Sequence, residues 1–168
     1  MEKSQDIWLI IRILLLTMTV TNPCFFLRAL QDYTFTLDIT VEQIGLTWLY
    51  YTPYEHGFYW WGGYGKSTEH TAYLNLRSGI MAPRSGSIEQ NGAAVAEQIG
   101  GQIFIDTWGL VVPGNPELAA TYAQKAANVS HGGNGVYGGM FIAACISKAF
   151  VEKDIQKIID SGLAVIPL

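Results

Sequence analysis

The stretch Ser130-His131-Gly132-Gly133-Asn134-Gly135-Val136-Tyr137-Gly138-Gly139 separates two alanine-rich segments and decides how this chain folds. Its glycines have no Cβ, so the backbone here can approach another element or a ligand closely. The residues that follow, Met140–Phe150, are small and apolar and predict a tightly packed helix. A glycine-rich loop before a helix presents free N–H groups, so the stretch is a candidate binding loop for an anionic or hydroxyl-rich ligand. The alternative is that His131 is a structural residue, satisfied within the fold.

The composition describes one domain with a large apolar core. The chain has 168 residues, of which 49% are hydrophobic and 14% charged, and its formal net charge is −4. It contains no run of Lys or Arg, which argues against nucleic acid as a partner. The two cysteines, Cys24 and Cys145, make neither a disulfide framework nor a zinc site.

The N-terminal residues have more than one interpretation. The segment Ile7–Val20 is apolar but is interrupted by Arg12, and it is too short and too broken for a membrane span. Because Lys3 precedes it, a signal peptide is one alternative. We expect residues 1–24 to be a leader or a first helix and residues 25–168 to form the domain. The expected location is the cytoplasm, or outside the cell if residues 1–24 are a signal peptide.

Three local signals predict where helices begin. Thr40 and Gln43 have the spacing of a capping box. Ser67 or Thr68 can cap the next helix through its hydroxyl group. The pair Asn115-Pro116 combines a good N-cap with a proline at the first helical position.

Apolar periodicity predicts further helices and no convincing strand. Gly92–Val112 has apolar residues at helical spacing, although Gly100-Gly101 weakens that helix. Within it, Gln102–Val112 is the segment that could instead form a short strand. A last helix is expected to begin near Lys153 and to end at Gly162. The predicted fold class is therefore all-α, with small residues bringing helices close together.

Several motifs, taken together and in order, resemble the ADP-ribosylglycohydrolase family, the all-helical hydrolases that remove ADP-ribose from proteins and related substrates. The matching motifs are Trp60-Trp61-Gly62-Gly63-Tyr64-Gly65, Ser67-Thr68-Glu69-His70-Thr71-Ala72, Pro83-Arg84-Ser85-Gly86-Ser87 with Asn91-Gly92, Ala96-Glu97-Gln98-Ile99-Gly100 with Phe104-Ile105-Asp106, Pro113-Gly114-Asn115-Pro116-Glu117, and Ser130–Gly139 with Ala143-Ala144. The resemblance covers about residues 28–167. It implies a compact multi-helix fold, incomplete in this chain, and ADP-ribose or an ADP-ribosylated substrate as the partner.

The resemblance also implies a substrate-binding site. Asn91-Gly92 is similar to the family's Asn-Gly segment beside the ADP-ribose pocket, although it is also an ordinary turn signal. Ser130-His131 is similar to the family's Ser/Thr-His pair, whose imidazole lies in the ligand cleft. Gly135 and Tyr137 belong to the same loop, so these residues together are the expected binding residues. No catalytic residue is assigned.

Three further residues are candidates with an alternative beside them. Glu69 and His70 lie in a motif that matches the family, but both could instead lie on a solvated helix face. Asp106 could belong to the site, or it could be a helix cap or a paired core carboxylate.

The resemblance implies magnesium as the cofactor of intact family members, with acidic ligands near both ends of the chain. Two adjacent Mg²⁺ ions, held by hard oxygen ligands, would polarise the ribose and orient a water molecule. This sequence contains no Asp-Asp pair and no Asp-x-Asp, and Thr21-Asn22-Pro23-Cys24 stands where the first motif is expected. We therefore assign no metal ligand and expect this chain not to bind magnesium.

The function expected from the resemblance is that of an ADP-ribosylglycohydrolase-like domain. The family reaction is hydrolysis of the glycosidic bond of ADP-ribosylated substrates, and we expect this chain to be truncated and inactive by itself. One alternative is a non-catalytic remnant that binds ADP-ribose. Another is a small secreted helical protein.

Overall fold

The computed structural model describes residues 21–36, 38–55 and 59–167. Every regular element in these ranges is a helix, which confirms the predicted all-α class. In chain order the elements are α2 (Thr21–Asp32), α3 (Val41–Tyr51), α4 (Thr68–Arg77), the short 3-10 helix η2 (Arg84–Gly86), α5 (Ile88–Asn91), α6 (Ala93–Ala96), α7 (Gly100–Ile103), α8 (Asp106–Leu110), α9 (Pro116–Ala127), α10 (Gly133–Ala149) and α11 (Ile155–Ala164). The predicted leader segment Ile7–Val20 lies outside the described residues. Within them, no helix is both long and apolar enough to cross a bilayer.

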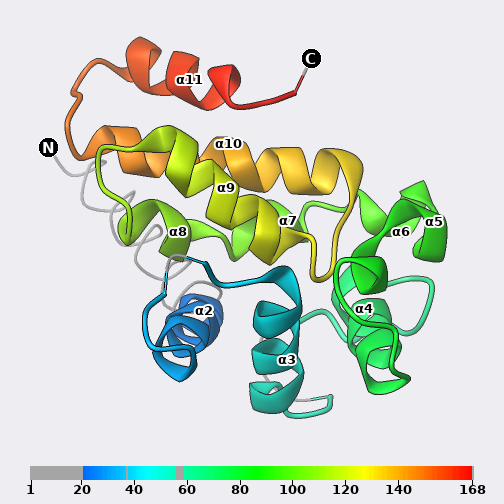
Figure 1. Ribbon diagram of the computed structural model, residues 1–168. Coiled ribbons are helices and arrows are strands. Elements are labelled where there is room, and N and C mark those ends of the chain that lie inside the picture. Colours follow the sequence, from blue (N-terminus) through cyan, green and yellow to red (C-terminus); the bar gives the residue numbers. More distant parts are fainter. Residues whose placement is uncertain (1–20, 37, 56–58, 168) are drawn as a thin grey trace, which may run out of the picture.

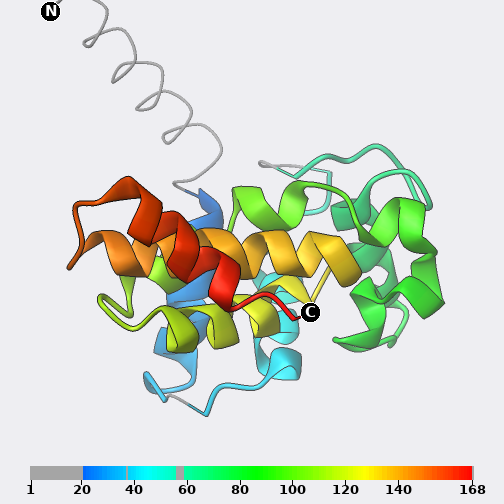
Figure 2. The same ribbon diagram turned by 90° about the horizontal axis from the view of Figure 1, so that it is seen from above.

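The helices lie in three layers. Helices α9 and α10 run side by side through the middle of the molecule, together with α7 and α8 (Figure 1). Helix α11 covers α10 from one side, as the view from above also shows (Figure 2). Helices α2, α3 and α4 form the layer on the opposite side. The middle layer is therefore covered on both faces.

Small and aromatic side chains share the core between these layers. Ala123 of α9 and Ala143 of α10 are fully buried, and such small side chains let the two helices pack closely. Trp108 of α8 is also fully buried and stacks on Tyr122, with ring centroids 5.4 Å apart. Phe26 of α2 packs against the same indole at 5.6 Å. Apolar burial therefore joins the middle layer to the α2 layer.

The three predicted helix starts are confirmed. The Thr40 hydroxyl accepts a hydrogen bond from the Gln43 N–H at 3.2 Å, and the Gln43 side chain accepts one from the Thr40 N–H at 2.8 Å. Ser67 caps α4, and Asn115 caps α9 with a proline directly after it. Each cap satisfies backbone N–H groups that the helix itself leaves unpaired.

The prediction of one helix over Gly92–Val112 was wrong, and so was the strand alternative for Gln102–Val112. The segment forms three short helices, α6, α7 and α8. The chain turns between them, which brings Gly101 against the backbone of α10, where a Cβ would collide with the Gly135 carbonyl oxygen. A continuous helix could not make this contact while also burying Trp108.

Helix α10 begins at Gly133, seven residues before the predicted start at Met140. The glycine-rich stretch is therefore mostly helical rather than a loop. A Cβ on Gly139 would lie 2.7 Å from the Gly101 carbonyl oxygen, so its glycine is needed for contact with α7. Close helix packing has overridden the low helix propensity of glycine.

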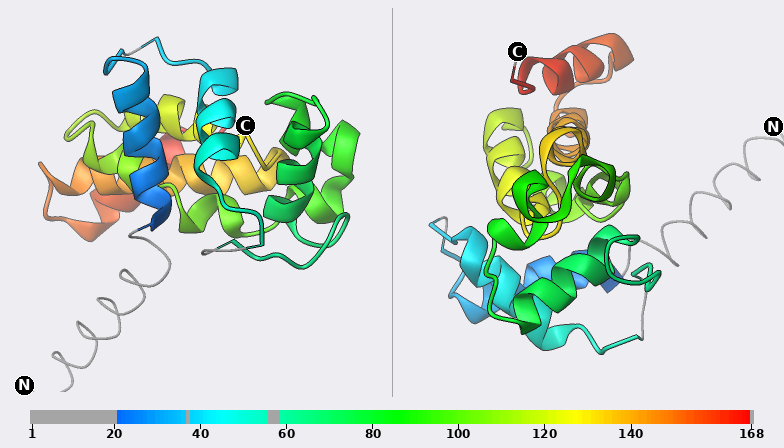
Figure 3. Two further views of the ribbon diagram at one scale, coloured as in Figure 1. Left: turned by 90° about the horizontal axis from the view of Figure 1, so that it is seen from below. Right: turned by 90° about the vertical axis from the view of Figure 1, so that its right-hand side faces the viewer.

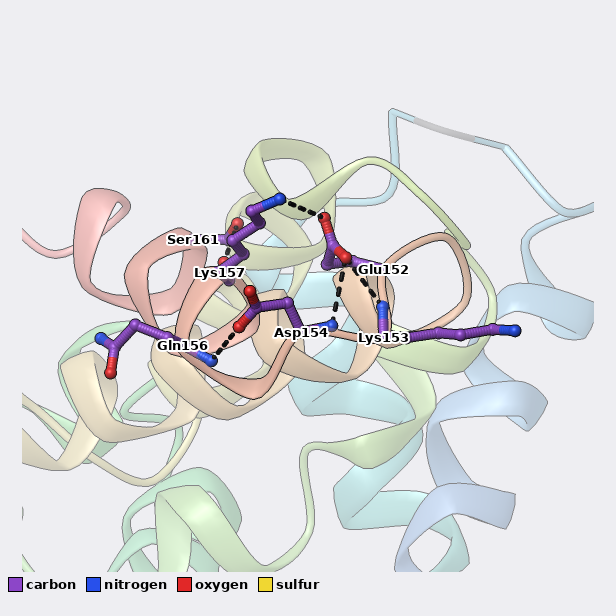
Figure 4. Close-up of polar contacts among 6 residues, drawn as sticks. All are labelled: Glu152, Lys153, Asp154, Gln156, Lys157 and Ser161. Atoms are coloured by element: carbon purple, nitrogen blue, oxygen red, sulfur yellow. Dashed lines mark hydrogen bonds and ion pairs between the residues drawn. The ribbon is translucent and has the colours of Figure 1, made fainter.

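The last helix, α11, begins two residues after the predicted Lys153 and continues past Gly162. The Asp154 carboxylate caps it by accepting the Gln156 N–H at 2.9 Å, and Glu152 accepts the N–H groups of the next two residues (Figure 4). Gly162 does not end the helix because it faces α10, where a Cβ would lie 2.5 Å from the Cys145 sulfur.

Candidate functional site

His131 lies between α9 and α10 and is fully buried. Its Nε2 accepts a hydrogen bond from the Gly101 N–H at 3.0 Å, and its Nδ1 lies 2.7 Å from the Ser130 hydroxyl oxygen. Because Nε2 is an acceptor, we assign the ring proton to Nδ1, which donates to Ser130. Burial lowers the pKa of His131 to about 3, so the imidazole is neutral near pH 7.

The Glu69 carboxylate reaches the same place from α4. A Cβ on Gly100 would collide with Glu69 Oε1 and would lie 2.9 Å from His131 Nε2. The Ser67 hydroxyl donates to Glu69 Oε2 at 3.3 Å. Burial raises the pKa of Glu69, which favours its protonated form relative to an exposed carboxyl. The structure thus brings Glu69 and His131 together around the backbone of α7.

A second hydrogen-bond network holds Asn91. The Asn91 side chain donates to the Ser85 carbonyl at 2.8 Å and accepts from the Asn75 side chain at 2.8 Å. Asn75 also donates to Ser85, and the Ser85 hydroxyl donates to the Val129 carbonyl at 2.6 Å. Gly92 follows with a φ of +79°, a conformation that suits glycine, and it is exposed. The Asn91 amide is therefore fixed in place at the surface.

These networks hold two segments against each other. A Cβ on Gly86 would lie 2.5 Å from the His131 backbone nitrogen, so this contact requires glycine. The segments enclose a small cavity of about 200 Å³, and its walls include Pro83, Ser87, Ile88, Asn128, His131 and Gly133. Small-molecule sites usually measure about 300–1,000 Å³. The cavity therefore fits one ring or one sugar of a larger ligand.

The start of α10 already has an anion. The Glu97 carboxylate accepts a hydrogen bond from the Asn134 N–H at 2.8 Å, and a Cβ on Gly133 would collide with the same oxygen. A carboxylate at this position interacts favourably with the helix dipole. The N–H groups that the sequence offers to an external anion are thus partly occupied by a side chain of the protein itself.

Gly135 and Tyr137 lie on α10, away from the small cavity. Gly135 is buried, and a Cβ there would lie 2.8 Å from the Ala96 carbonyl oxygen. Tyr137 is half-buried and packs against the hydrophobic core. Both residues fix the first turns of α10 against its neighbours.

His70 is buried, so the prediction of a solvated helix face is wrong for this residue. Its Nδ1 accepts from the Gly63 N–H at 3.1 Å, and the ring of Trp61 packs edge-on at 5.1 Å. Within the described residues, His70 Nε2 has no hydrogen-bond partner.

Asp106 is the first residue of α8 and is partly buried. Burial raises the pKa of its carboxyl. Helix α8 has no side-chain cap, and Asp106 forms no ion pair with any residue that the structure describes. Neither the cap nor the paired carboxylate is therefore present in the described part of the chain.

Sequence reasoning did not identify four residues that shape this region, namely Asn75, Ser85, Glu97 and Gly101. The pair Gly100-Gly101 carried a visible signal, because two adjacent glycines within an apolar segment indicate close packing. Glu97 carried none, because its partner Asn134 is 37 residues away in the sequence.

The carboxylates of this region do not fit a pair of magnesium ions. Among residues 21–36, 38–55 and 59–167, no three His, Cys, Asp or Glu side chains are grouped so that they could hold a metal ion. Glu69 interacts with Ser67, Glu97 interacts with α10, and Asp106 lies on α8. Magnesium prefers six oxygen ligands in an octahedron, and this arrangement does not offer them.

Comparison with known proteins gives one result. The model of the family described as ADP-ribosylglycohydrolase matches residues 16–167, which is nearly the whole chain. No curated protein and no solved structure matches. The family match includes the Asn91 network, the His131 loop and all the helices from α2 to α11. The chain belongs to the ADP-ribosylglycohydrolase family.

Proposed function

We propose that this chain is a domain that binds the ADP-ribosyl group of a modified substrate where Pro83–Gly92 meets Ser130–Gly133. The observation that carries the proposal is the pair of hydrogen-bond networks, centred on Ser85 and His131, that hold these segments around one cavity. Family membership supports ADP-ribose as the ligand class.

The residues would have different roles in this site. Asn91 and Gly92 lie at the surface end of the Ser85 network and would contact the ligand. Ser130 and the neutral His131 would hold the loop in place, because their ring and hydroxyl atoms already bond to each other and to α7. Gly135 and Tyr137 would position α10 behind the loop.

We propose further that these 168 residues do not hydrolyse the glycosidic bond by themselves. The sequence has neither Asp-Asp nor Asp-x-Asp, and the described residues offer no cluster of metal ligands. The magnesium-dependent step of the family therefore has no identified ligands here. The proposed activity is binding.

Calorimetric titration with ADP-ribose tests the binding site. We expect the wild-type chain to bind, and Asn91→Ala and His131→Ala to weaken binding at least about fivefold, since about 1 kcal/mol of contact or loop positioning is lost. Lys153→Gln is a control variant near α11, and its affinity should equal that of the wild type. Circular dichroism establishes that each variant is folded. Equal affinity of folded Asn91→Ala and wild type would remove this site from the proposal.

Release of ADP-ribose from a mono-ADP-ribosylated protein tests the second part. We expect the same background release with the chain, with the chain plus magnesium, and with buffer alone. Magnesium-dependent release above that background would show that the chain is catalytic and that its metal ligands lie outside the described residues.

A further inference from the structure

A second and larger cavity lies in the α2, α3 and α4 layer. Its volume is about 1040 Å³, and its walls include Asp32, Tyr50, Tyr51, Tyr54, Tyr73 and Arg77. Figure 3, left, shows α2 and α3 side by side with α4 beyond them. It has no lining residue in common with the cavity at His131. It is therefore a separate site.

The walls of this cavity are rich in aromatic rings. Tyr54 and Tyr73 stack with centroids 5.6 Å apart and an interplanar angle of 22°. Tyr50 and Tyr51 meet edge to face at 4.9 Å. Tyr50 is 81% exposed and Tyr54 is 41% exposed, so ring surface is available to a ligand. Aromatic ligands pack well against such rings.

The charges at the cavity are unequal in their pairing. Arg28 is engaged, because its Nε lies 3.0 Å from the Asp32 carboxylate and donates to the Tyr51 hydroxyl at 2.8 Å. The Asp32 charge is thereby compensated. The nearby Glu55 carboxylate is hydrogen-bonded to the Tyr54 hydroxyl.

Arg77 differs from Arg28 in this respect. It forms no ion pair with any carboxylate of the described residues, and it is exposed. Its guanidinium carbon lies 5.4 Å from the Tyr54 ring centroid and 5.8 Å from that of Tyr73. Cation–π contact holds the planar group beside the rings and leaves its donors open to an anion.

We propose that this cavity binds a small aromatic anion, with its ring against Tyr54 and its phosphate or carboxylate on Arg77. Guanidinium groups recognise both anions through paired N–H donors. The ring contact and the charge contact lie next to each other on the same wall, so a ligand that joins both groups gains from each. Either group alone gains only one contact.

Titration calorimetry with phenyl phosphate and with benzoate tests the proposal and separates the two kinds of anion. We expect at least one of them to bind at least about tenfold more tightly than phenol or inorganic phosphate, which each carry half of the ligand. Arg77→Gln should weaken that binding about tenfold, and Arg77→Lys should weaken it less. Tyr54→Leu should weaken it through loss of the ring contact. Lys153→Gln removes the same charge elsewhere and should have no effect.

Three results would overturn the proposal: no binding of either aromatic anion, equal affinity for phenyl phosphate and inorganic phosphate, or unchanged affinity in folded Arg77→Gln. The test is independent of the proposed function, because Asn91→Ala should keep the wild-type affinity for phenyl phosphate. ADP-ribose also carries a ring and phosphates, so its titration is repeated in Arg77→Gln. Binding that persists there and depends on Asn91 belongs to the first cavity.

Discussion

At the scale of single residues, His131 shows how a polar side chain in a glycine-rich stretch can have a structural role. Its two ring nitrogens connect Ser130 to Gly101, and none of the ring reaches solvent. The neutral ring satisfies a backbone N–H that would otherwise be buried and unpaired. Leaving such a group unpaired costs about 1–3 kcal/mol, so the histidine stabilises the loop whatever the loop binds.

The burial of His131 predicts a pH-dependent stability. Its pKa is about 3 in the folded chain and about 6.5 when exposed, so between these values only the unfolded chain binds the proton. Its contribution to stability is therefore complete above pH 6.5 and falls as the pH drops toward 3, by at most about 1.4 kcal/mol per pH unit. Urea unfolding of the wild type at several pH values from 7 to 4 measures this slope.

The variant His131→Gln isolates the effect, because glutamine can still accept the Gly101 N–H but does not titrate. The raised pKa of Glu69 acts in the opposite direction, since its contribution declines as the pH rises above about 4.3. Glu69 is present in both proteins, so the difference between them reports His131. Parallel pH profiles for the two proteins would contradict the assignment of a neutral buried imidazole.

At the scale of helices, contact between α7 and α10 depends on glycines that face backbone atoms. Gly139 faces the Gly101 carbonyl, which cannot move without moving α7. The next residue toward the N-terminus, Gly138, faces only the side chain of Gln102, which can rotate away. The two adjacent glycines on α10 are therefore expected to respond differently to substitution.

We expect Gly139→Ala to lower the free energy of unfolding by about 1–3 kcal/mol, because the added methyl group overpacks the helix contact. Gly138→Ala should leave stability unchanged or raise it by up to about 1 kcal/mol, because alanine favours a helix. Denaturant unfolding of both variants compares them directly. Similar losses in the two variants would mean that glycine is needed for flexibility rather than for close contact.

The start of α10 gives another prediction about this helix. In Glu97→Ala the carboxylate that accepts the Asn134 N–H is gone, so stability should fall by about 0.5–2 kcal/mol. The emptied helix start should then be stabilised more by sulfate than the wild-type helix is. Thermal unfolding in sodium sulfate and in sodium chloride at equal ionic strength measures both effects. Equal sulfate responses in the two proteins would argue against Glu97 as the resident anion.

The helix boundaries show which features the sequence could predict. Thr40, Ser67 and Asn115 mark helix starts correctly, because a cap bonds to N–H groups only three residues away. The start of α10 and the breaks between α6, α7 and α8 could not be found in this way. They depend on contacts such as Gly101 with Gly135, which the sequence separates by 34 positions. For the site, the motif indicated His131, but not its burial.

At the scale of the whole molecule, α11 forms an outer layer that rests on α10 through Gly162. The Cys145 sulfur lies beneath that glycine and interacts with the Ile158 carbonyl of α11. Burial raises the pKa of the Cys145 thiol, which reduces the fraction of reactive thiolate. The reactivity of this thiol therefore reports whether the outer layer is in place.

In a Cys24→Ser background, we expect Cys145 to react with a disulfide reagent such as DTNB at least about tenfold more slowly than in the urea-unfolded chain. Gly162→Leu should accelerate the reaction, because the larger side chain displaces α11 from Cys145 and Phe141. Absorbance of the released thiolate gives the rates. A rate in the folded protein equal to that in urea would mean that α11 does not cover this thiol.

The division of residues 93–110 into three short helices has a consequence for hydrogen exchange. Helices of four or five residues do not persist alone in water, so the amides of α6, α7 and α8 owe their protection to α10. They should therefore open together, as one cooperative unit that includes the hydrogen bond from Gly101 to His131. The loop at His131 and the aromatic core at Trp108 would then lose protection at the same denaturant concentration, although they lie in different parts of the middle layer.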